Sequence, residues 1–198
     1  QSITGLDFQP DWVWIKKREL KNHQLYDSVR GATQALESDS TSAETTRTTE
    51  LTSFNSDGFS LGSGAKTNES SGTYVSWNWL GGGTASSNTD GSITSNVSAN
   101  TTSGFSIVSY TGTGSTATVG HGLSSAPAMI LIKGRSFSDE WLVYHQSMGN
   151  TDAINLNLTN AKSSSINYWQ NTTPSSSVVY IGANDKHNKS SETFIGYC

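Results

Sequence analysis

Four histidines and a few carboxylates are the side chains that could act as catalysts or bind a metal. No pair of the histidines has the spacing of a zinc-binding motif, and the chain has a single cysteine, Cys198. A Ser-His-Asp triad can be drawn from almost any chain with this many serines. The strings NSDG, NTDG and NDKHN are as typical of turns as of calcium loops. We therefore predict no metal and no cofactor. The histidines are His23, His121, His145 and His187.

Paired carboxylates would be needed for glycoside hydrolysis. The closest candidates are Asp139 and Glu140, with Asp152 as a third group. Asp139 and Glu140 are adjacent within the polar string SFSDEW, which is more typical of a solvated loop than of a catalytic pair. We predict that the chain is not an enzyme, and a polysaccharide hydrolase stays the least favoured alternative.

Cations next to aromatic residues are the stronger candidate for a binding site. The phrase PDWVWIKKR (10–18) recurs as PAMILIKGR (127–135), so Lys16 and Arg18 have counterparts in Lys133 and Arg135. In an extended strand Lys16 and Arg18 share a face with two tryptophans, which suits a sugar or an anionic glycan. The alternative is structural: each arginine pairs with a carboxylate or extends over the rim of the core. We favour the structural interpretation and keep the four cations as ligand-binding candidates.

The tryptophans divide into two groups by what occupies the matching position of the repeat. Trp12 and Trp14 are matched by Met129 and Leu131, and Trp77 is matched by Tyr197. Exchange among large apolar residues is what core packing tolerates, so we expect these positions to be buried. Trp141 and Trp169 are matched by smaller or polar residues and lie near predicted loops. We therefore predict that Trp141 and Trp169 form an exposed recognition surface.

The repeat extends well beyond this phrase and predicts an internal duplication. LYDSVRGATQAL (25–36) aligns with VYHQSMGNTDAI (143–154), and FSLGSGAKTNESSGTYVSW (59–77) aligns with VYIGANDKHNKSSETFIGY (179–197). The order of the matches never changes. We predict a first β repeat at 1–80 and a second at 105–198.

Both repeats have the pattern of strands with polar turns. WVWIKK (12–17) is apolar on both faces at its start and charged at its end, which is typical of a strand buried on both sides that ends in solvent. TYVSWNWL (73–80) alternates strictly. Asp-Gly and Gly turns at 55–58, 88–91 and 111–114 separate the strands. The prediction is an all-β fold of two related sandwich-like or jelly-roll-like units, with one turn of helix within 41–50.

Residues 81–104 are almost entirely Gly, Ser, Thr and Asn. Such a segment is typical of a flexible connector between the two repeats. Ile93, Val97 and the turn string NTDG instead favour partial order, with an edge strand inside the segment. Both possibilities remain open at this point.

Composition bounds the classes of partner. The net charge of -4 and the 14% of charged residues give no electrostatic reason to expect nucleic acid or an anionic membrane as partner. No apolar run has the length that spans a bilayer, so we expect no membrane insertion. The single cysteine excludes an internal disulfide.

A long string carries a resemblance to a known class of protein. NTDGSITSNVSANTTSGFSIVSYTGTGSTATVGHGLSSAPAMILIKGR (88–135), together with FQPDWVWIKKR (8–18) and LYDSVRGA (25–32), resembles a module of structural proteins from tailed bacteriophages of marine bacteria and cyanobacteria. In those proteins the module occurs in tandem, in tail-fibre or capsid-appendage chains. The resemblance covers nearly the whole sequence and implies that the chain is a piece of a longer protein.

The resemblance implies a class of function and carries over no catalytic residue. We expect a virion structural or adhesive protein, assembled in the bacterial cytoplasm and located on the virion surface. Its expected partners are other virion proteins of the capsid or tail, or a host-surface glycan. A homo-oligomer is expected, a trimer by analogy with phage fibres. A free carbohydrate-binding, lectin-like module is the alternative.

Overall fold

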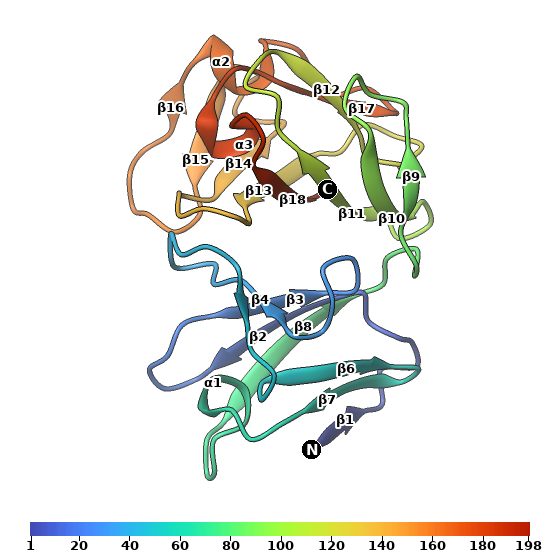
Figure 1. The fold of residues 1–198 in the computed structure, drawn as a ribbon, viewed down its shortest axis with the longest axis vertical. Coiled ribbons are helices and arrows are strands. Elements are labelled where there is room, and N and C mark those ends of the chain that lie inside the picture. The colour runs from blue at the N-terminus through green and yellow to red at the C-terminus, as the bar shows by residue number, and fades with distance from the viewer.

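The computed structural model describes residues 1–198 and has two lobes (Figure 1). We call residues 1–80 the N-lobe and residues 81–198 the C-lobe. The chain is all-β, as predicted, with only three single-turn helices. None of these helices is long and apolar enough to cross a membrane.

The N-lobe consists of short sheets that face one another. A three-stranded sheet has the order β3-β2-β8, a second has the order β1-β7-β6, and β4 pairs with β5. All pairings are antiparallel. The elements are β1 (Ser2–Thr4), β2 (Trp12–Lys17), β3 (Gln24–Asp27), β4 (Gln34–Ala35), β5 (Thr45–Thr46), β6 (Leu51–Asn55), β7 (Gly58–Leu61), α1 (Ala65–Asn68) and β8 (Tyr74–Trp79).

The C-lobe is built on one eight-stranded sheet. Its order is β16-β15-β14-β13-β18-β11-β10-β9, and β12 pairs with β17 in a separate two-stranded sheet. The elements are β9 (Ser86–Asn88), β10 (Ser95–Asn100), β11 (Phe105–Thr111), β12 (Ala117–Gly120), β13 (Met129–Gly134), β14 (Leu142–His145), β15 (Asp152–Asn155), β16 (Ser163–Ser164), α2 (Ile166–Trp169), β17 (Val178–Ile181), α3 (Asp185–Asn188) and β18 (Thr193–Tyr197).

The same strand orders occur in both lobes. The order β3-β2-β8 in the N-lobe matches β14-β13-β18 in the C-lobe, and the pair β1-β7 matches β12-β17. A single helical turn precedes the last strand of each lobe, as α1 and α3. The lobes differ at two sheet edges. β18 carries β11, β10 and β9 while β8 has no strand on its outer side, and β7 carries β6 while β17 has no strand in that place.

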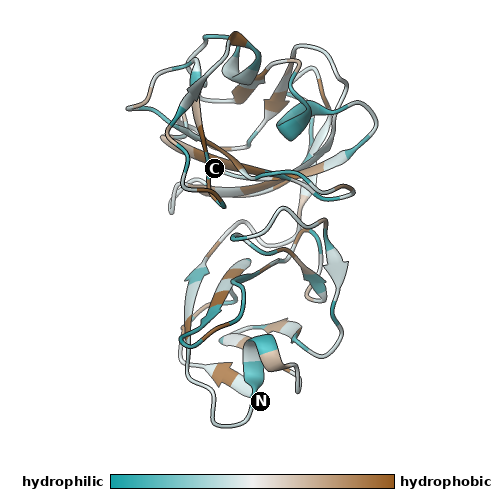
Figure 2. Cartoon of the chain, turned by 90° about the vertical axis from the view of Figure 1, so that its left-hand side faces the viewer, coloured by the Kyte–Doolittle hydropathy of each residue, from teal (hydrophilic) through white to brown (hydrophobic).

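Three apolar clusters hold the molecule together. One lies inside the N-lobe around Val13, Ile15 and Phe59, and a larger one lies inside the C-lobe around Ile132 and Phe194. The third joins the lobes and includes residues from both, such as Trp12, Leu25, Trp141 and Tyr197. Figure 2 shows apolar residues concentrated on strands, including the C-lobe sheet that faces the N-lobe.

Several local predictions can be checked directly. The NSDG turn joins β6 to β7 with Gly58 at φ 145°, as expected for a tight hairpin. Of the two possibilities left open for residues 81–104, partial order is the one observed: β9 is an edge strand, and residues 95–100 form β10 of the same sheet. The helical turn predicted within 41–50 is wrong, because Thr45–Thr46 pairs with Gln34–Ala35 as strand β5.

Candidate functional site

The site that stands out is an apolar cleft between the lobes. β2 and β8 place their tryptophans directly opposite one another, with Trp12 paired to Trp79 and Trp14 paired to Trp77. We call the groove in front of them the aromatic cleft; its volume is about 260 Å³. It is lined by Trp12, Trp14, Trp79, Phe105, Met129, Leu131, Leu156, Tyr197 and Cys198.

Alternation along β2 explains why so many aromatic rings face the cleft. Val13 and Ile15 point into the N-lobe and are 0% and 2% exposed. The residues between them therefore point to the opposite face, toward the C-lobe. Trp12 lies where the lobes touch and stacks on Tyr197 at a centroid distance of 4.3 Å. Trp14 lies two residues further along the strand and is half-buried.

A second, shallower hollow continues the cleft toward solvent. Trp14, His23, Trp77 and Trp79 line it, and Trp77 is 45% exposed. Trp14 Nε1 donates to His23 Nδ1 at 2.7 Å, so the ring proton of neutral His23 lies on Nε2. Burial lowers the pKa of His23, which favours this neutral form. The result is an aromatic wall with one polar group at its outer end.

The lining determines which ligands the cleft suits. All nine residues around the main groove are apolar, so binding would come from burial of apolar or aromatic surface. Trp12 is 4% exposed, and its buried Nε1 has no hydrogen-bond partner.

The predicted roles of the tryptophans are largely reversed in the structure. Trp141 and Trp169, predicted to be exposed, are 0% and 1% exposed, so that prediction is wrong. Trp169 Nε1 donates to Asp152 O at 3.0 Å inside the C-lobe. Trp141 Nε1 donates to Glu37 O at 2.9 Å, because a segment of the N-lobe covers it. Of the tryptophans predicted to be buried, Trp77 is instead 45% exposed and lines the outer hollow.

The four cations of the repeated phrase are placed differently in the two lobes. Lys16 lies on β2 beyond the cleft, where its Nζ donates to Lys17 O. Arg18 follows the end of β2, is exposed and has no ion pair. Lys133 is fully buried and donates to Gly134 O at 2.8 Å. Arg135 forms the carboxylate pair expected by the structural interpretation. The structure brings none of the four into the aromatic cleft.

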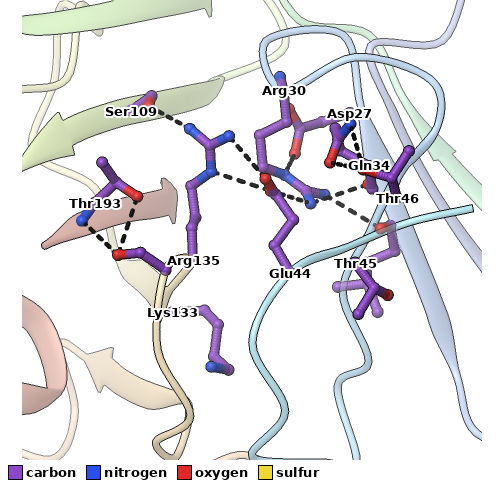
Figure 3. Close-up of polar contacts among 12 residues, drawn as sticks. Asp27, Arg30, Gln34, Glu44, Thr45, Thr46, Ser109, Lys133, Arg135 and Thr193 are labelled. Atoms are coloured by element: carbon purple, nitrogen blue, oxygen red, sulfur yellow. Dashed lines mark hydrogen bonds and ion pairs between the residues drawn. The ribbon is translucent and has the colours of Figure 1, made fainter.

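Arg135 belongs to a polar network that crosses between the lobes (Figure 3). Its Nε and Nη2 donate to the two oxygens of Glu44 at 3.0 and 2.9 Å. Glu44 Oε2 also accepts from Arg30 Nη1 at 3.0 Å. Although burial opposes ionisation, the hydrogen bonds and charges of the two arginines hold the pKa of Glu44 below its usual value. Glu44 therefore ties an arginine of each lobe to one carboxylate.

The buried end of this network is formed by Asp27, Arg30 and Tyr197. Arg30 Nε donates to Asp27 Oδ2 at 2.5 Å, and both side chains are 0% exposed. Tyr197 of the C-lobe donates to the same oxygen at 2.7 Å and accepts from Arg30 Nη2 at 3.3 Å. With the apolar cluster beside them, these bonds fix the angle between the lobes. The aromatic cleft is therefore formed before any ligand arrives.

Buried Lys133 gives a pH dependence that can be measured. Burial lowers its pKa from 10.5 to about 8, which outweighs the nearby charges of Asp139 and Glu140. Between pH 8 and pH 10.5 Lys133 keeps its proton in the unfolded chain but loses it in the folded chain. The free energy of unfolding should therefore rise with pH over this range, by up to about 3 kcal/mol. Lys133→Met should flatten that rise. Urea unfolding from pH 7.5 to 10.5 measures this, with Lys16→Met as the matched control; an unchanged rise in Lys133→Met would contradict the assignment.

Two of the three carboxylates considered for hydrolysis are bound to cations, and all three lie outside every cavity. Glu140 pairs with Lys186 at 2.9 Å, and Asp152 pairs with Lys162. Hydrogen bonds from Asp139 and Lys186 lower the pKa of Glu140 to about 2, while burial raises that of Asp139. No Asp or Glu lines any of the cavities. The hydrolase alternative therefore lacks two carboxylates in a cleft.

Two further motifs that could carry chemistry are structural in their surroundings. The string GFSLG (58–62) has the Gly-x-Ser-x-Gly pattern, but it is strand β7 rather than a strand-to-helix turn. Its Ser60 Oγ accepts from Asn55 Nδ2 at 2.8 Å. His121 and His187 are fully buried, and no group of three metal-ligating side chains forms.

Sequence reasoning missed the cleft because it needs both lobes. The signal was present in part: TYVSWNWL places Val75, Trp77 and Trp79 on one face, and that face adjoins the face of β2 that ends in Lys16. The face of β2 with Trp12, Trp14 and Lys16 ends in a charged residue, whereas the apolar run of the other face ends in Ile15. The first face is therefore the one that the sequence favours for exposure to solvent. Met129 and Leu156 could not be assigned to it, because they come from the other lobe.

Comparison with known proteins gives one match. No curated protein matches the chain, and no solved structure matches it. A family model described as "Domain of unknown function (DUF7483)" matches residues 1–198. Because that match covers every residue of the two lobes, the chain belongs to the DUF7483 family.

Proposed function

We propose that this chain is a non-enzymatic structural and adhesive module of a bacteriophage particle, located on the virion surface. The aromatic cleft is the observation that carries the proposal, because it is an open, preformed apolar groove between two firmly joined lobes. An exposed tryptophan at the mouth of such a groove is typical of a site for another macromolecule. The phage context comes from the sequence resemblance.

We further propose that the two lobes are related units that arose by internal duplication. The matched sheet orders support this, as do the positions of the helical turns before β8 and β18. The registers agree as well, since Ile15 pairs with Ser76 in the N-lobe while Ile132 pairs with Gly196 in the C-lobe. Duplicated modules suit a role in which weak contacts are multiplied by copy number on a particle. A trimer stays a prediction from analogy.

The favoured partner is an apolar segment of another virion protein of the capsid or tail. A sugar needs several polar groups around its hydroxyls, and no polar side chain lines the main groove. A protein segment with one or two large apolar side chains would bury them against Trp14, Trp79 and Leu131.

Location on the particle is the first test of this proposal. Antibodies against the chain should label the exterior of purified particles, and the chain should co-purify with them through density-gradient centrifugation. A chain that stays in the lysate while the particles band free of it would contradict the virion assignment. Particles that carry a different surface protein are the control for adventitious adsorption.

Carbohydrate binding is the second candidate, and one observation favours it. In the outer hollow the ring of Trp77 is exposed beside His23, whose Nε2 carries the ring proton. A flat ring with a donor at its edge suits a sugar that stacks and accepts one hydrogen bond. A glycan array should then give saturable binding that Trp77→Ala removes and Trp169→Phe leaves unchanged. An array with no signal would exclude this candidate.

A further inference from the structure

The two lobes differ at the edge of their corresponding central strands. In the C-lobe, β18 is paired with β13 on one side and with β11 on the other. In the N-lobe, β8 is paired with β2 alone. Exposed strand edges with apolar neighbours are normally covered in folded proteins. On β8, Val75 and Trp77 are 38% and 45% exposed.

The interior behind each edge differs in the same way. In the C-lobe a space of only about 10 Å³ remains, lined by Ile132, Val179, Ile181 and Gly196 together with Val108 and Tyr110 of β11. In the N-lobe the corresponding space is about 180 Å³, and it is lined by Ile15, Phe59, Leu61 and Ser76 among others. Ile15, Phe59, Leu61 and Ser76 lie at the strand positions that correspond to Ile132, Val179, Ile181 and Gly196 of the C-lobe, in that order. No residues of the N-lobe take the place of Val108 and Tyr110.

We propose that the edge of β8 accepts one antiparallel donor strand with the residue pattern of β11. The donor is an extended polypeptide segment with valine and tyrosine at alternate positions on one face and, directly before the valine, an aliphatic residue on the other face. The precedent within this chain sets the register, since Val108 lies opposite Gly196 and Tyr110 opposite Phe194. A donor valine therefore lies opposite Ser76, and a donor tyrosine lies opposite Tyr74.

The side chains at the edge fit this arrangement. A Cβ at Gly196 would meet no atom closer than 3.8 Å, so the serine at the corresponding position of β8 leaves room for a neighbouring strand. Tyr110 stacks on Phe194 at a centroid distance of 5.3 Å, and a donor tyrosine would stack on Tyr74 in the same way. On the other face, Ile107 lies opposite Tyr197. The matching donor residue would cover Trp77.

The backbone of β8 is also available. Arg18 N donates to Thr73 O, so the backbone groups of Thr73 face β2. Because backbone groups alternate in direction along a strand, those of Val75 and Trp77 face β2 as well. The N–H and C=O groups of Ser76 and Asn78 therefore face outward. In the C-lobe the position after β18 exchanges two such bonds with β11, each 3.0 Å long, between Cys198 and Ser106. Strand addition would satisfy the same groups on β8. The inference uses the correspondence of the lobes and does not depend on what the aromatic cleft binds.

The experiment adds a synthetic peptide of β11 sequence, SGFSIVSYTGT (103–113), to the full chain and follows amide hydrogen exchange by NMR. At saturating peptide, exchange of the Ser76 and Asn78 amides should slow at least tenfold. A peptide with serine in place of Val108 and Tyr110 should bind at least tenfold more weakly. Equal binding of the two peptides would overturn the proposal, because it would show that the interior space plays no part.

A chain variant isolates the edge from the rest of the fold. Proline at Ser76 removes an outward N–H and keeps the β2–β8 bonds, so Ser76→Pro should fold but lose at least tenfold in peptide affinity. If that variant does not fold, exchange in the unaltered chain still decides. Faster exchange of the Ser106 amide, which is bonded to Cys198 O, without slower exchange on β8 would show displacement of the chain's own β11 and overturn the proposal. The proposal would also be overturned if the Ser76 amide exchanged slowly without peptide and sedimentation showed the chain to be a dimer. That result would identify a second copy of the chain as the occupant of the β8 edge.

Discussion

Arg30→Met is expected to lower the free energy of unfolding by about 3–5 kcal/mol, the usual effect of removing one partner of a buried ion pair. Asp27 would remain as a charge with a fully buried side chain, with Tyr197 and backbone groups as its only donors. The Arg30 guanidinium also bonds to Glu44, so the change loosens the contact between the lobes. Urea unfolding at neutral pH measures the loss.

Two further variants separate charge from geometry in this prediction. Arg30→Lys keeps the charge but cannot reach Asp27, Glu44 and Tyr197 together, so an intermediate loss is expected. Combining Arg30→Met with Asp27→Asn removes the unpaired charge and should recover part of the stability. A loss below about 1 kcal/mol in Arg30→Met would contradict the role assigned to the network.

Trp141→Ala is the second change with a large expected effect, a loss of about 3–5 kcal/mol. The side chain is 0% exposed, packs in the cluster that joins the lobes and donates to Glu37 O of the N-lobe. Removing it creates a cavity at the junction and leaves that carbonyl with only the 3.4 Å bond from Ser40 N. Trp77→Ala is the matched control, because its ring is 45% exposed, and we expect a loss of at most about 1 kcal/mol.

Thermal and urea unfolding of these two variants check the prediction. Trp141→Phe should lie between them, since it keeps most of the apolar volume and loses the hydrogen bond to Glu37. Equal stability of Trp141→Ala and Trp77→Ala would show that the junction between the lobes is not the packed core described here.

The local fold could be predicted from sequence because it follows from short patterns. WVWIKK forms β2 with Val13 and Ile15 buried and the lysines half-buried at its end, as the alternation of residues indicated. The hairpin at 55–58 follows from Asn and Gly at the positions that need them. Residues 41–50 could not be predicted in this way, because their conformation depends on contact with the C-lobe: Glu44 N donates to Arg135 O at 2.8 Å.

The candidate site could not be predicted because it depends on which surfaces the lobes bring together. Trp141 follows the polar string SFSDE, which predicts exposure, yet a segment more than a hundred residues earlier covers it. Arg18 and Arg135 occupy the same place in the repeated phrase. Only Arg135 finds a carboxylate, because Glu44 reaches it from the other lobe. The residue pattern within a strand shows which side chains share a face, but it does not show which of the two faces contacts another lobe.

The central claim is that the aromatic cleft is the surface through which the chain attaches to its particle. The direct measurement is binding of the purified chain to particles produced without it, compared with binding of Met129→Ala, because Met129 lines the cleft and is 43% exposed. We expect saturable binding that Met129→Ala weakens by at least about tenfold, or about 1.4 kcal/mol, with unfolding unchanged. Equal binding of a folded Met129→Ala chain would contradict the claim and move the attachment surface elsewhere on the molecule.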